Sequence, residues 1–342
     1  MKRLQIISGP CSAESEIQVL KTAEGLKDAG VDYFRAGLWK PRTHPGCFEG
    51  AGVSAIPWMK RVREEFGLKI CTEVANRQHT RACIDAGFDM LWIGARTTVN
   101  TFQVQEIAEA LKGADIPVYV KNPVSRDLGL WAGAIERLRA QGISNPGLIH
   151  RGFPTFEQTR YRNLPEWQAA IEMRSAFPDL PMICDPSHIA GDAALVAEIA
   201  QQAVDLGLDG LMIECHFNPE SALSDRAQQL TPEEFTGLIS SLHVRDRDTD
   251  DRTYRARLAE LRSKIDTYDD AILYALARRM DVSREIGRIK REHNISILQM
   301  SRWDELMEKA VLSGKEKGLP EEFVRAVFNE IHKASVISQK NQ

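Results

Sequence analysis

The feature that most constrains the fold of this chain is a regular alternation of short apolar runs with longer amphipathic segments. Eight β-rich runs are candidate strands, at 4–8, 33–38, 69–74, 90–94, 117–122, 147–152, 181–186 and 210–215. Eight strands alternating with helices over about 240 residues are typical of an α/β fold of the (β/α)8, or TIM, barrel type. The rival, an open doubly wound sheet, usually carries a glycine-rich turn after its first strand, where this chain has Gly9-Pro10-Cys11-Ser12.

The pattern changes after residue 242. Residues 243–257 (HVRDRDTDDRTYRAR) are charge-dense and lack apolar periodicity, which predicts a linker or the start of a helix. From Leu258 to Ile289 apolar residues recur every three or four positions, as in one long amphipathic helix. Two further helices are expected over about 301–317 and 320–339. We therefore predict a barrel at 1–242, a linker at 243–257 and an all-α three-helix domain at 258–342.

Composition excludes several classes of protein. A formal net charge of −4 gives no sign of a nucleic-acid or membrane-surface partner for the chain as a whole. No apolar run approaches the roughly 20 residues that span a bilayer, and the start MKRLQIISGP has too short an apolar run for a signal peptide. The six cysteines lie apart without a Cys-x-x-Cys pair, so reduced thiols in the cytoplasm are expected.

The ends of the predicted strands are rich in reactive side chains. In a (β/α)8 barrel the active site gathers where the strands end. In strand order the chain places there Cys11, Arg35 (with Lys40 and Arg42 beyond it), Glu73, Arg96, Lys121, Arg151 (preceded by His150), Asp185 with His188, and Glu214 with His216. A single polar residue at a loop start is common, but agreement among all eight ends predicts one shared site.

These side chains divide into two chemical sets. The first is cationic and large enough for two phosphates and a carboxylate: Arg35, Lys40, Arg42, Arg96, Lys121 and Arg151. The second offers a thiolate, an imidazole and two carboxylates: Cys11, His188, Glu214 and Asp225. Mixed sulfur, nitrogen and oxygen ligands suit one divalent transition metal ion better than Mg2+ or Ca2+.

Five ordered segments carry a family resemblance. They are Gly9-Pro10-Cys11-Ser12, 35–43 (RAGLWKPRT), Ile93-Gly94-Ala95-Arg96, Asp185-Pro186-Ser187-His188 and 211–225 (LMIECHFNPESALSD). Together they resemble class I 3-deoxy-D-arabino-heptulosonate 7-phosphate (DAHP) synthase, in its short subclass, over nearly all of residues 1–240. The resemblance implies condensation of phosphoenolpyruvate with erythrose 4-phosphate, the first step of the shikimate pathway.

The resemblance also implies roles for individual residues. Cys11, His188, Glu214 and Asp225 match the metal ligands, with Mn2+ expected ahead of Fe2+, Co2+ or Zn2+. Lys40 matches the lysine near the phosphoenolpyruvate carboxylate. The phosphate of phosphoenolpyruvate would be held by Arg96, Lys121 and Arg151, with Arg35 beside them. The erythrose 4-phosphate contacts are matched by Arg42 and Thr43. The Arg-Thr pair also argues against the sibling synthase that uses arabinose 5-phosphate. Two neighbours depart from close relatives: Asn122 follows Lys121 and His150 precedes Arg151, where Arg and Glu are frequent.

The resemblance also implies a mechanism in which these residues take part. The metal would polarise the aldehyde oxygen of erythrose 4-phosphate, and carbon 3 of phosphoenolpyruvate would attack that carbonyl. Water would then add at carbon 2 before phosphate leaves. Lys40, Cys11 and His188 are the expected catalytic residues of the barrel. Glu73, His216 and a metal-bound water are candidate proton carriers, and the sequence does not choose between them.

The predicted long helix carries a second constellation. Arg279 interrupts the apolar stripe, either as an interfacial arginine whose charged end reaches water or as a ligand-binding residue. Lys290 lies about 16 Å along the axis and only about 20° around it, so both side chains could converge on one dianion. Arg262 lies about 25 Å from Arg279 along the same helix and would reach that ligand only from a second chain.

This spacing resembles the all-helical chorismate mutases over about residues 256–340. The matching segments are 261–265 (LRSKI), 277–279 (ARR), 287–290 (GRIK) and 335–339 (SVISQ). The resemblance implies a homodimer in which Arg279 and the second chain's Arg262 bind the substrate carboxylates. Lys290 and Gln339 would bind the ether oxygen, and Arg302 and Ser335 also fall on binding positions. Trp303 stands where many of these mutases carry a glutamate, and Gln299 where an aspartate is frequent. These departures leave three alternatives for the domain: a mutase with altered contacts, a related isochorismate lyase, or a ligand-sensing dimerisation module.

Two hypotheses follow for the whole chain. In the first, the chain has two activities, DAHP synthesis and the conversion of chorismate to prephenate, and a ligand of the helical domain inhibits the synthase. In the second, the helical domain is a non-catalytic dimerisation module that senses chorismate or prephenate. An assembly larger than a dimer is compatible with both.

Overall fold

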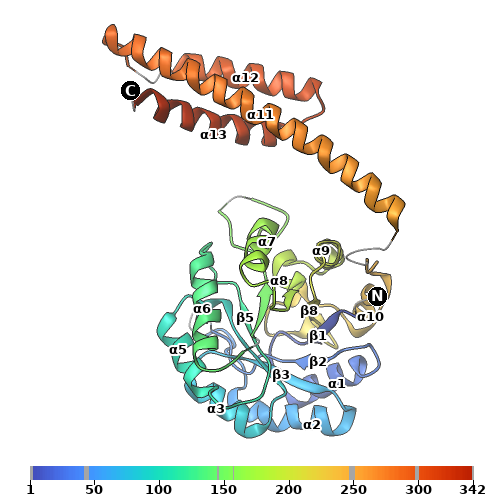
Figure 1. Cartoon of the computed structure of the whole chain (residues 1–342). Coiled ribbons are helices and arrows are strands. Elements are labelled where there is room, and N and C mark those ends of the chain that lie inside the picture. Colours follow the sequence, from blue (N-terminus) through green and yellow to red (C-terminus); the bar gives the residue numbers. More distant parts are fainter. Residues whose placement is uncertain are drawn as a thin grey trace. The chain divides into compact units, whose positions relative to one another are not determined.

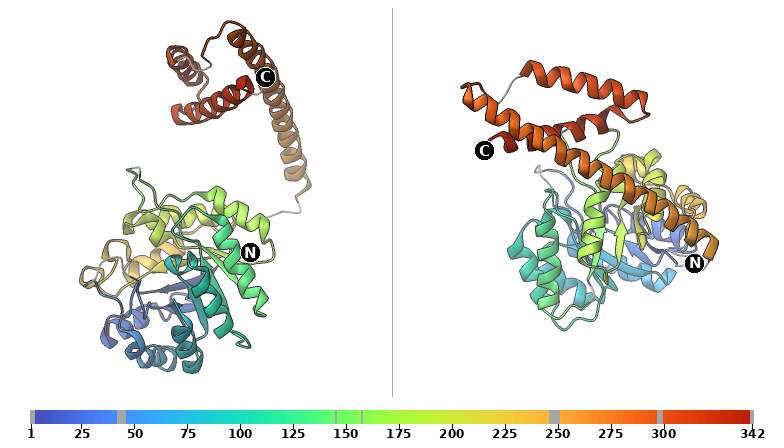
Figure 2. Two further views of the ribbon diagram at one scale, coloured as in Figure 1. Left: turned by 90° about the vertical axis from the view of Figure 1, so that its left-hand side faces the viewer. Right: turned by 45° about the horizontal axis from the view of Figure 1, so that its top comes forward.

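The computed structural model describes residues 3–41, 46–144, 146–156, 158–245, 251–296 and 300–340. The chain divides into two compact units, Met1–Arg247 and Asp248–Gln342. Figures 1 and 2 show both units from several sides. Among the described residues no helix combines the length and the apolar character that a membrane crossing requires.

The first unit is a closed barrel of parallel strands in the order β1 to β8, with β1 paired to β8 (Figure 1). The strands are β1 (Gln5–Gly9), β2 (Tyr33–Arg35), β3 (Lys69–Val74), β4 (Met90–Ile93), β5 (Val118–Lys121), β6 (Gly147–His150), β7 (Met182–Cys184) and β8 (Gly210–Glu214). Each coincides with one of the eight predicted apolar runs. The predicted TIM barrel is confirmed, and the open doubly wound sheet is excluded because β1 and β8 close the ring.

Helices surround this ring. They are α1 (Glu16–Leu26), α2 (Ile56–Phe66), α3 (Arg77–Ala86), α4 (Ala95–Thr98), α5 (Thr101–Ala110), α6 (Leu128–Ala140), α7 (Trp167–Ala176), α8 (Pro186–Ala190), α9 (Ala193–Asp205) and α10 (Pro232–Ser241), with short 3-10 turns η1 (Gly52–Ala55), η2 (Pro219–Ser221) and η3 (Arg226–Gln228). Polar side chains begin many of them. Ser15 accepts a hydrogen bond from the backbone N–H of Gln18, and Thr231 forms a capping box with Glu234. Such caps satisfy N–H groups that a helix start leaves without partners.

Two apolar cores hold the barrel together. The larger lies between the strands and the surrounding helices and includes Phe34, Trp131 and Phe235. The smaller consists of side chains from the strands themselves, such as Trp92 and Met212. Because successive side chains of a strand point to opposite faces, each strand supplies both cores.

Gly9 allows the first strand to pass close to the second. Its φ is +145°, and a Cβ at this position would lie 2.1 Å from the backbone oxygen of Arg35. Only glycine accommodates both the dihedral angle and this contact. The chain then turns directly into Cys11, at the same end of the barrel where the other strands stop.

The second unit contains three helices, α11 (Arg252–Glu292), α12 (Met300–Glu316) and α13 (Glu321–Lys340). α13 packs along α11 and also contacts α12. The N-terminal half of α11 extends beyond its two neighbours (Figures 1 and 2). Most large apolar residues of the predicted stripe, in both halves of α11, are exposed in the single chain, by between 41% at Ile286 and 69% at Tyr268.

Candidate active site

A polar pocket lies where the barrel strands end. Its empty volume is about 590 Å³. The side chains that line it are Lys40, Pro41, Glu73, Ala95, Arg96, Lys121, Val124, Arg151, Arg162, His188 and Asp225. Parallel strands of a closed barrel all end on one side, so residues far apart in the sequence meet there.

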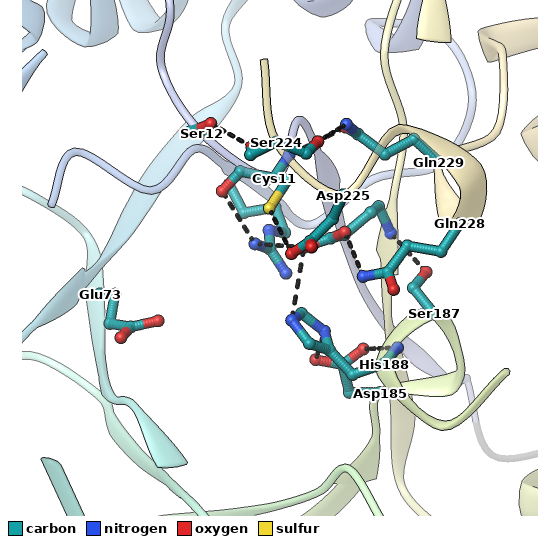
Figure 3. Close-up of polar contacts among 12 residues, drawn as sticks. Cys11, Ser12, Glu73, Asp185, Ser187, His188, Ser224, Asp225, Gln228 and Gln229 are labelled. Carbon is teal, nitrogen blue, oxygen red and sulfur yellow. Dashed lines mark hydrogen bonds and ion pairs between the residues drawn. The ribbon is translucent and has the colours of Figure 1, made fainter. Parts of the chain in front are cut away.

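A thiol and two carboxylates meet at one side of this pocket (Figure 3). Among the described residues, Cys11, Glu214 and Asp225 each offer a ligand atom within 4.8 Å of the other two. The Sγ of Cys11 donates to Oδ2 of Asp225 over 3.3 Å. Burial, reinforced by Glu214, raises the pKa of Cys11 to about 12. A cation at this position would reverse that effect and favour the thiolate.

His188 lies next to the three grouped residues, although it is not one of them. Its Nε2 is 3.8 Å from Oε1 of Glu214, while its Nδ1 is 2.8 Å from Oδ2 of Asp185. Asp185 also caps α8 by accepting from the backbone N–H of His188 over 3.1 Å. Burial lowers the pKa of His188, against the opposing effect of Asp185. A neutral imidazole with one nitrogen facing a carboxylate and the other facing the ligand cluster is the usual arrangement of a metal-binding histidine.

Buried cations lie at the ends of β2, β5 and β6, namely Arg35, Lys121 and Arg151. Arg35 donates to Glu214 over 3.0 Å, and Lys121 donates to Asp185 over 2.6 Å. Both cations lie over the ring of Trp92. Burial lowers the pKa of Lys121, although Asp185 opposes the shift. The pocket therefore holds its cations in place before any anion arrives.

The two departures from close relatives stabilise the loop after β6. Asn122 accepts from the backbone N–H of Arg151 over 2.7 Å and donates to the backbone oxygen of Gly152 over 2.9 Å. His150 points instead toward the aromatic rings of Trp131 and Trp167. Neither residue lines the pocket, and Arg151, which does, is held at its backbone by Asn122.

Comparisons with known proteins agree with this geometry. A family model described as the DAHP synthetase I family matches residues 1–247. The chain belongs to the DAHP synthetase I family. A second model, chorismate mutase type II, matches residues 261–340, so a DAHP synthase domain is fused to a chorismate mutase domain. The resemblance predicted from the sequence is confirmed for both domains.

Individual relatives match the synthase domain. The phospho-2-dehydro-3-deoxyheptonate aldolase of Thermotoga maritima is 30% identical over 237 residues, covering 69% of this chain and 68% of that protein. Its crystal structure matches with a TM-score of 0.63 at 30% identity, over 69% of this chain and 67% of that one. A 2-dehydro-3-deoxyphosphooctonate aldolase of Wolinella succinogenes is 27% identical over 268 residues, covering 69% of this chain and 97% of the relative.

Arg162 is a pocket residue that the sequence pattern does not predict. Arg162 lies in the long segment after β6 and lines the pocket, where it donates to Asp225 over 3.1 Å and to Gln228 over 2.8 Å. It lies eleven residues beyond Arg151, so the rule that strand ends carry the site could not find it. The predicted contacts Arg42 and Thr43 lie outside the described residues.

In the mutase domain, Arg279 of α11 contacts the Oγ of Ser335 on α13. Gly287 lies against Gln339, where a Cβ would approach the backbone of α13 to within 2.8 Å. The Oε1 of Gln339 is buried without a hydrogen-bond partner among the described residues. Three of the six predicted mutase positions, Arg279, Ser335 and Gln339, therefore lie along the α11–α13 contact.

The other predicted mutase positions lie farther along the helices. Arg262 and Lys290 both belong to the continuous helix α11, so their expected spacing from Arg279 holds. Arg302 belongs to α12, but its side chain lies outside the described residues. The ring of Trp303 lies against that of His332 on α13 in a tilted arrangement, with ring centroids 4.1 Å apart.

Proposed function

We propose that the barrel condenses phosphoenolpyruvate with erythrose 4-phosphate to form DAHP and phosphate. One observation carries the proposal: a pocket with several cations on its wall is bordered, at Asp225, by a grouped thiol and two carboxylates. Arg96, Lys121 and Arg151 would bind the phosphate of phosphoenolpyruvate, with Arg35 beside them, and Lys40 its carboxylate. Arg42 and Thr43 would bind erythrose 4-phosphate. The buried cations among them, Lys121, Arg151 and Arg35, suit this task because they stabilise anionic groups without reorganising.

The donor set fits a divalent transition metal. Cys11, Glu214 and Asp225 would hold the ion with His188, whose Nε2 faces Glu214. Sulfur, nitrogen and oxygen donors together favour Mn2+, Fe2+, Co2+ or Zn2+ over Mg2+ or Ca2+, and we propose Mn2+. When bound, the ion would supply Lewis acidity toward the aldehyde. Lys40 and the arginines would hold the phosphoenolpyruvate facing it.

The experiment measures phosphoenolpyruvate consumption by the purified chain before and after EDTA. Activity with erythrose 4-phosphate should fall to background with EDTA and return with Mn2+. Arabinose 5-phosphate serves as the competing aldehyde. A preference for arabinose 5-phosphate would overturn the proposed substrate, and activity that survives exhaustive chelation would overturn the proposed metal.

For the second domain we propose conversion of chorismate to prephenate in a homodimer, alone or within a larger assembly. Arg279, Lys290, Arg302, Ser335 and Gln339 of one chain would bind the substrate with Arg262 of the other. Three features support this: the Arg279–Ser335 contact, the buried Oε1 of Gln339 and the exposed apolar stripe of α11. A second copy of this chain would cover that stripe, which single soluble domains seldom leave in water.

The second candidate is a chorismate- or prephenate-sensing module without turnover, and Trp303 favours it. Its ring packs against His332 and offers no carboxylate to a substrate hydroxyl. Chorismate loss measured in the same sample as synthase activity decides between the two. With either outcome we propose feedback on the synthase, so saturating prephenate should lower its rate, and an unchanged rate would contradict feedback.

We also propose a cytoplasmic location for the protein and domain boundaries near residues 242 and 258. The six free cysteines agree with a reducing, cytoplasmic setting. The boundaries at 242 and 258 also stay a proposal. Helix α11 begins at Arg252, within the segment interpreted as a linker or helix start.

A further inference from the structure

Two consecutive glutamines, Gln228 and Gln229, lie beside the grouped thiol and carboxylates (Figure 3). Only 1% of Gln228 and 2% of Gln229 is exposed. Burying a primary amide is costly unless its donors and acceptor find partners. The partners of both side chains show what this burial achieves.

Gln228 connects two of the proposed metal ligands. Its Nε2 donates to Oε2 of Glu214 over 2.7 Å, and its Oε1 accepts from Nη1 of Arg162 over 2.8 Å. The same Nη1 lies 3.1 Å from Oδ1 of Asp225. A continuous path of hydrogen bonds therefore joins the carboxylates of Glu214 and Asp225 on the side away from Cys11.

Gln229 connects the third proposed ligand, Cys11, to the segment that carries Asp225. Its Oε1 accepts from the backbone N–H of Cys11 over 3.0 Å, and its Nε2 donates to the backbone oxygen of Ser224 over 2.8 Å. Ser224 also contacts the hydroxyl of Ser12. The loop that carries Cys11 is thus tied to the residue that precedes Asp225.

Asp225 needs such support because no strand holds it. It lies between η2 and η3 with φ at +45°, a left-handed conformation that is strained for residues other than glycine and tolerated by aspartate. Glu214 already pairs with the cation of Arg35 through Oε1, so the neutral amide of Gln228 orients Oε2 without adding a second positive charge.

We propose that Gln228 and Gln229 are positioning residues that keep Glu214, Asp225 and Cys11 at metal-binding spacing. This inference rests on the metal site proposed above. Removing partners of this kind typically lowers metal affinity by about 10- to 100-fold.

The experiment compares Mn2+ affinity among variants of the full chain by competition with a fluorescent chelator. Gln228→Met keeps the length of the side chain and loses both hydrogen bonds, so a loss of affinity of about 10-fold or more is expected. The matched control is Gln202→Met, because Gln202 also makes two side-chain hydrogen bonds, to Trp167 and Glu198, but on the outer helix α9. Its affinity should equal that of the wild type. With Co2+, Gln229→Met should weaken the thiolate-to-cobalt absorption band of Cys11.

The variant Glu214→Gln distinguishes failure of the proposed metal site from failure of the proposed positioning role. If the wild-type chain binds no Mn2+, or Glu214→Gln binds it equally well, the proposed metal site is wrong. If Glu214→Gln abolishes binding while Gln228→Met retains wild-type affinity, the positioning role is wrong and the metal site stands. Should circular dichroism show that Gln228→Met does not fold, Gln228→Asn replaces it. The shorter amide cannot reach Glu214 and Arg162 at once, so the same loss is expected and wild-type affinity would overturn the role.

Discussion

The ammonium group of Lys121 lies 2.6 Å from Oδ2 of Asp185, and both side chains are almost completely buried. The same carboxylate oxygen lies 2.8 Å from Nδ1 of His188. One aspartate, at the junction of β7 and α8, therefore orients a cation of the proposed phosphate cradle and an imidazole of the proposed metal site.

Replacing Asp185 by asparagine should destabilise the synthase domain. Asp185→Asn keeps an acceptor for the cap of α8 but leaves the buried Lys121 without its counter-charge. Breaking a buried pair in this way costs about 3–5 kcal/mol, measurable by urea denaturation at pH 7. The control is Asp205→Asn, which removes the partner of Arg245 in a largely exposed pair and should cost less than about 1 kcal/mol. Equal losses in both variants would contradict the prediction.

Gly9→Ala tests the close approach of β1 and β2. The added Cβ would meet the backbone oxygen of Arg35 at 2.1 Å, so the strands must shift and Cys11 must move with them. We expect a loss of about 3 kcal/mol or more in the free energy of unfolding, together with weaker Mn2+ binding. Gly30→Ala provides the comparison. Gly30 also has a positive φ, of +74°, but nothing lies within 4 Å of its Cβ position, so only the backbone cost of about 1–2 kcal/mol is expected.

His150 should make stability depend on acid pH. Burial, assisted by Arg151, lowers the pKa of His150 to about 4. The unfolded chain, with an ordinary histidine pKa near 6.5, then binds more protons than the folded chain between pH 6.5 and 4. Stability must therefore fall as the pH falls through this window, by up to about 3 kcal/mol from this residue. His150→Gln keeps a donor for the Pro165 backbone oxygen, and denaturation curves should show a correspondingly shallower loss. An identical slope in wild type and variant would exclude this role of His150.

Mixing two inactive chains tests the shared mutase site. Arg279→Ala and Arg262→Ala should each abolish chorismate turnover, with the synthase rate retained as the control for folding. If each site takes Arg279 from one chain and Arg262 from the other, a mixed dimer contains one intact site. Random exchange of the two variants should then restore about a quarter of the wild-type sites. Absence of any recovery after verified subunit exchange would mean that both arginines act within one chain. Full chorismate turnover by Arg262→Ala alone would mean that Arg262 has no role.

Much of the barrel site could be predicted because one sequence pattern, an apolar run followed by a reactive side chain, recurs along the chain. Arg96, Lys121, Arg151 and His188 each follow an apolar run, and parallel strands in a closed barrel end on one side. Arg162 was not predictable in this way, because it enters the pocket from a long segment that no strand positions. The roles of Gln228 and Gln229 could not be predicted either, because a glutamine in a loop carries no sequence signal for a site until its hydrogen-bond partners are known.

The sequence by itself determined the alternation that closes a barrel, the long amphipathic helix of the second domain and the identity of the groups at the strand ends. These features are written in the spacing of apolar residues along a single segment. Only the tertiary structure decided that Asp185 serves both Lys121 and His188, that His150 turns into an aromatic cluster, and that Gln228 connects Glu214 to Arg162. Those relationships depend on distances between segments far apart in the chain, which packing sets and which no local pattern encodes.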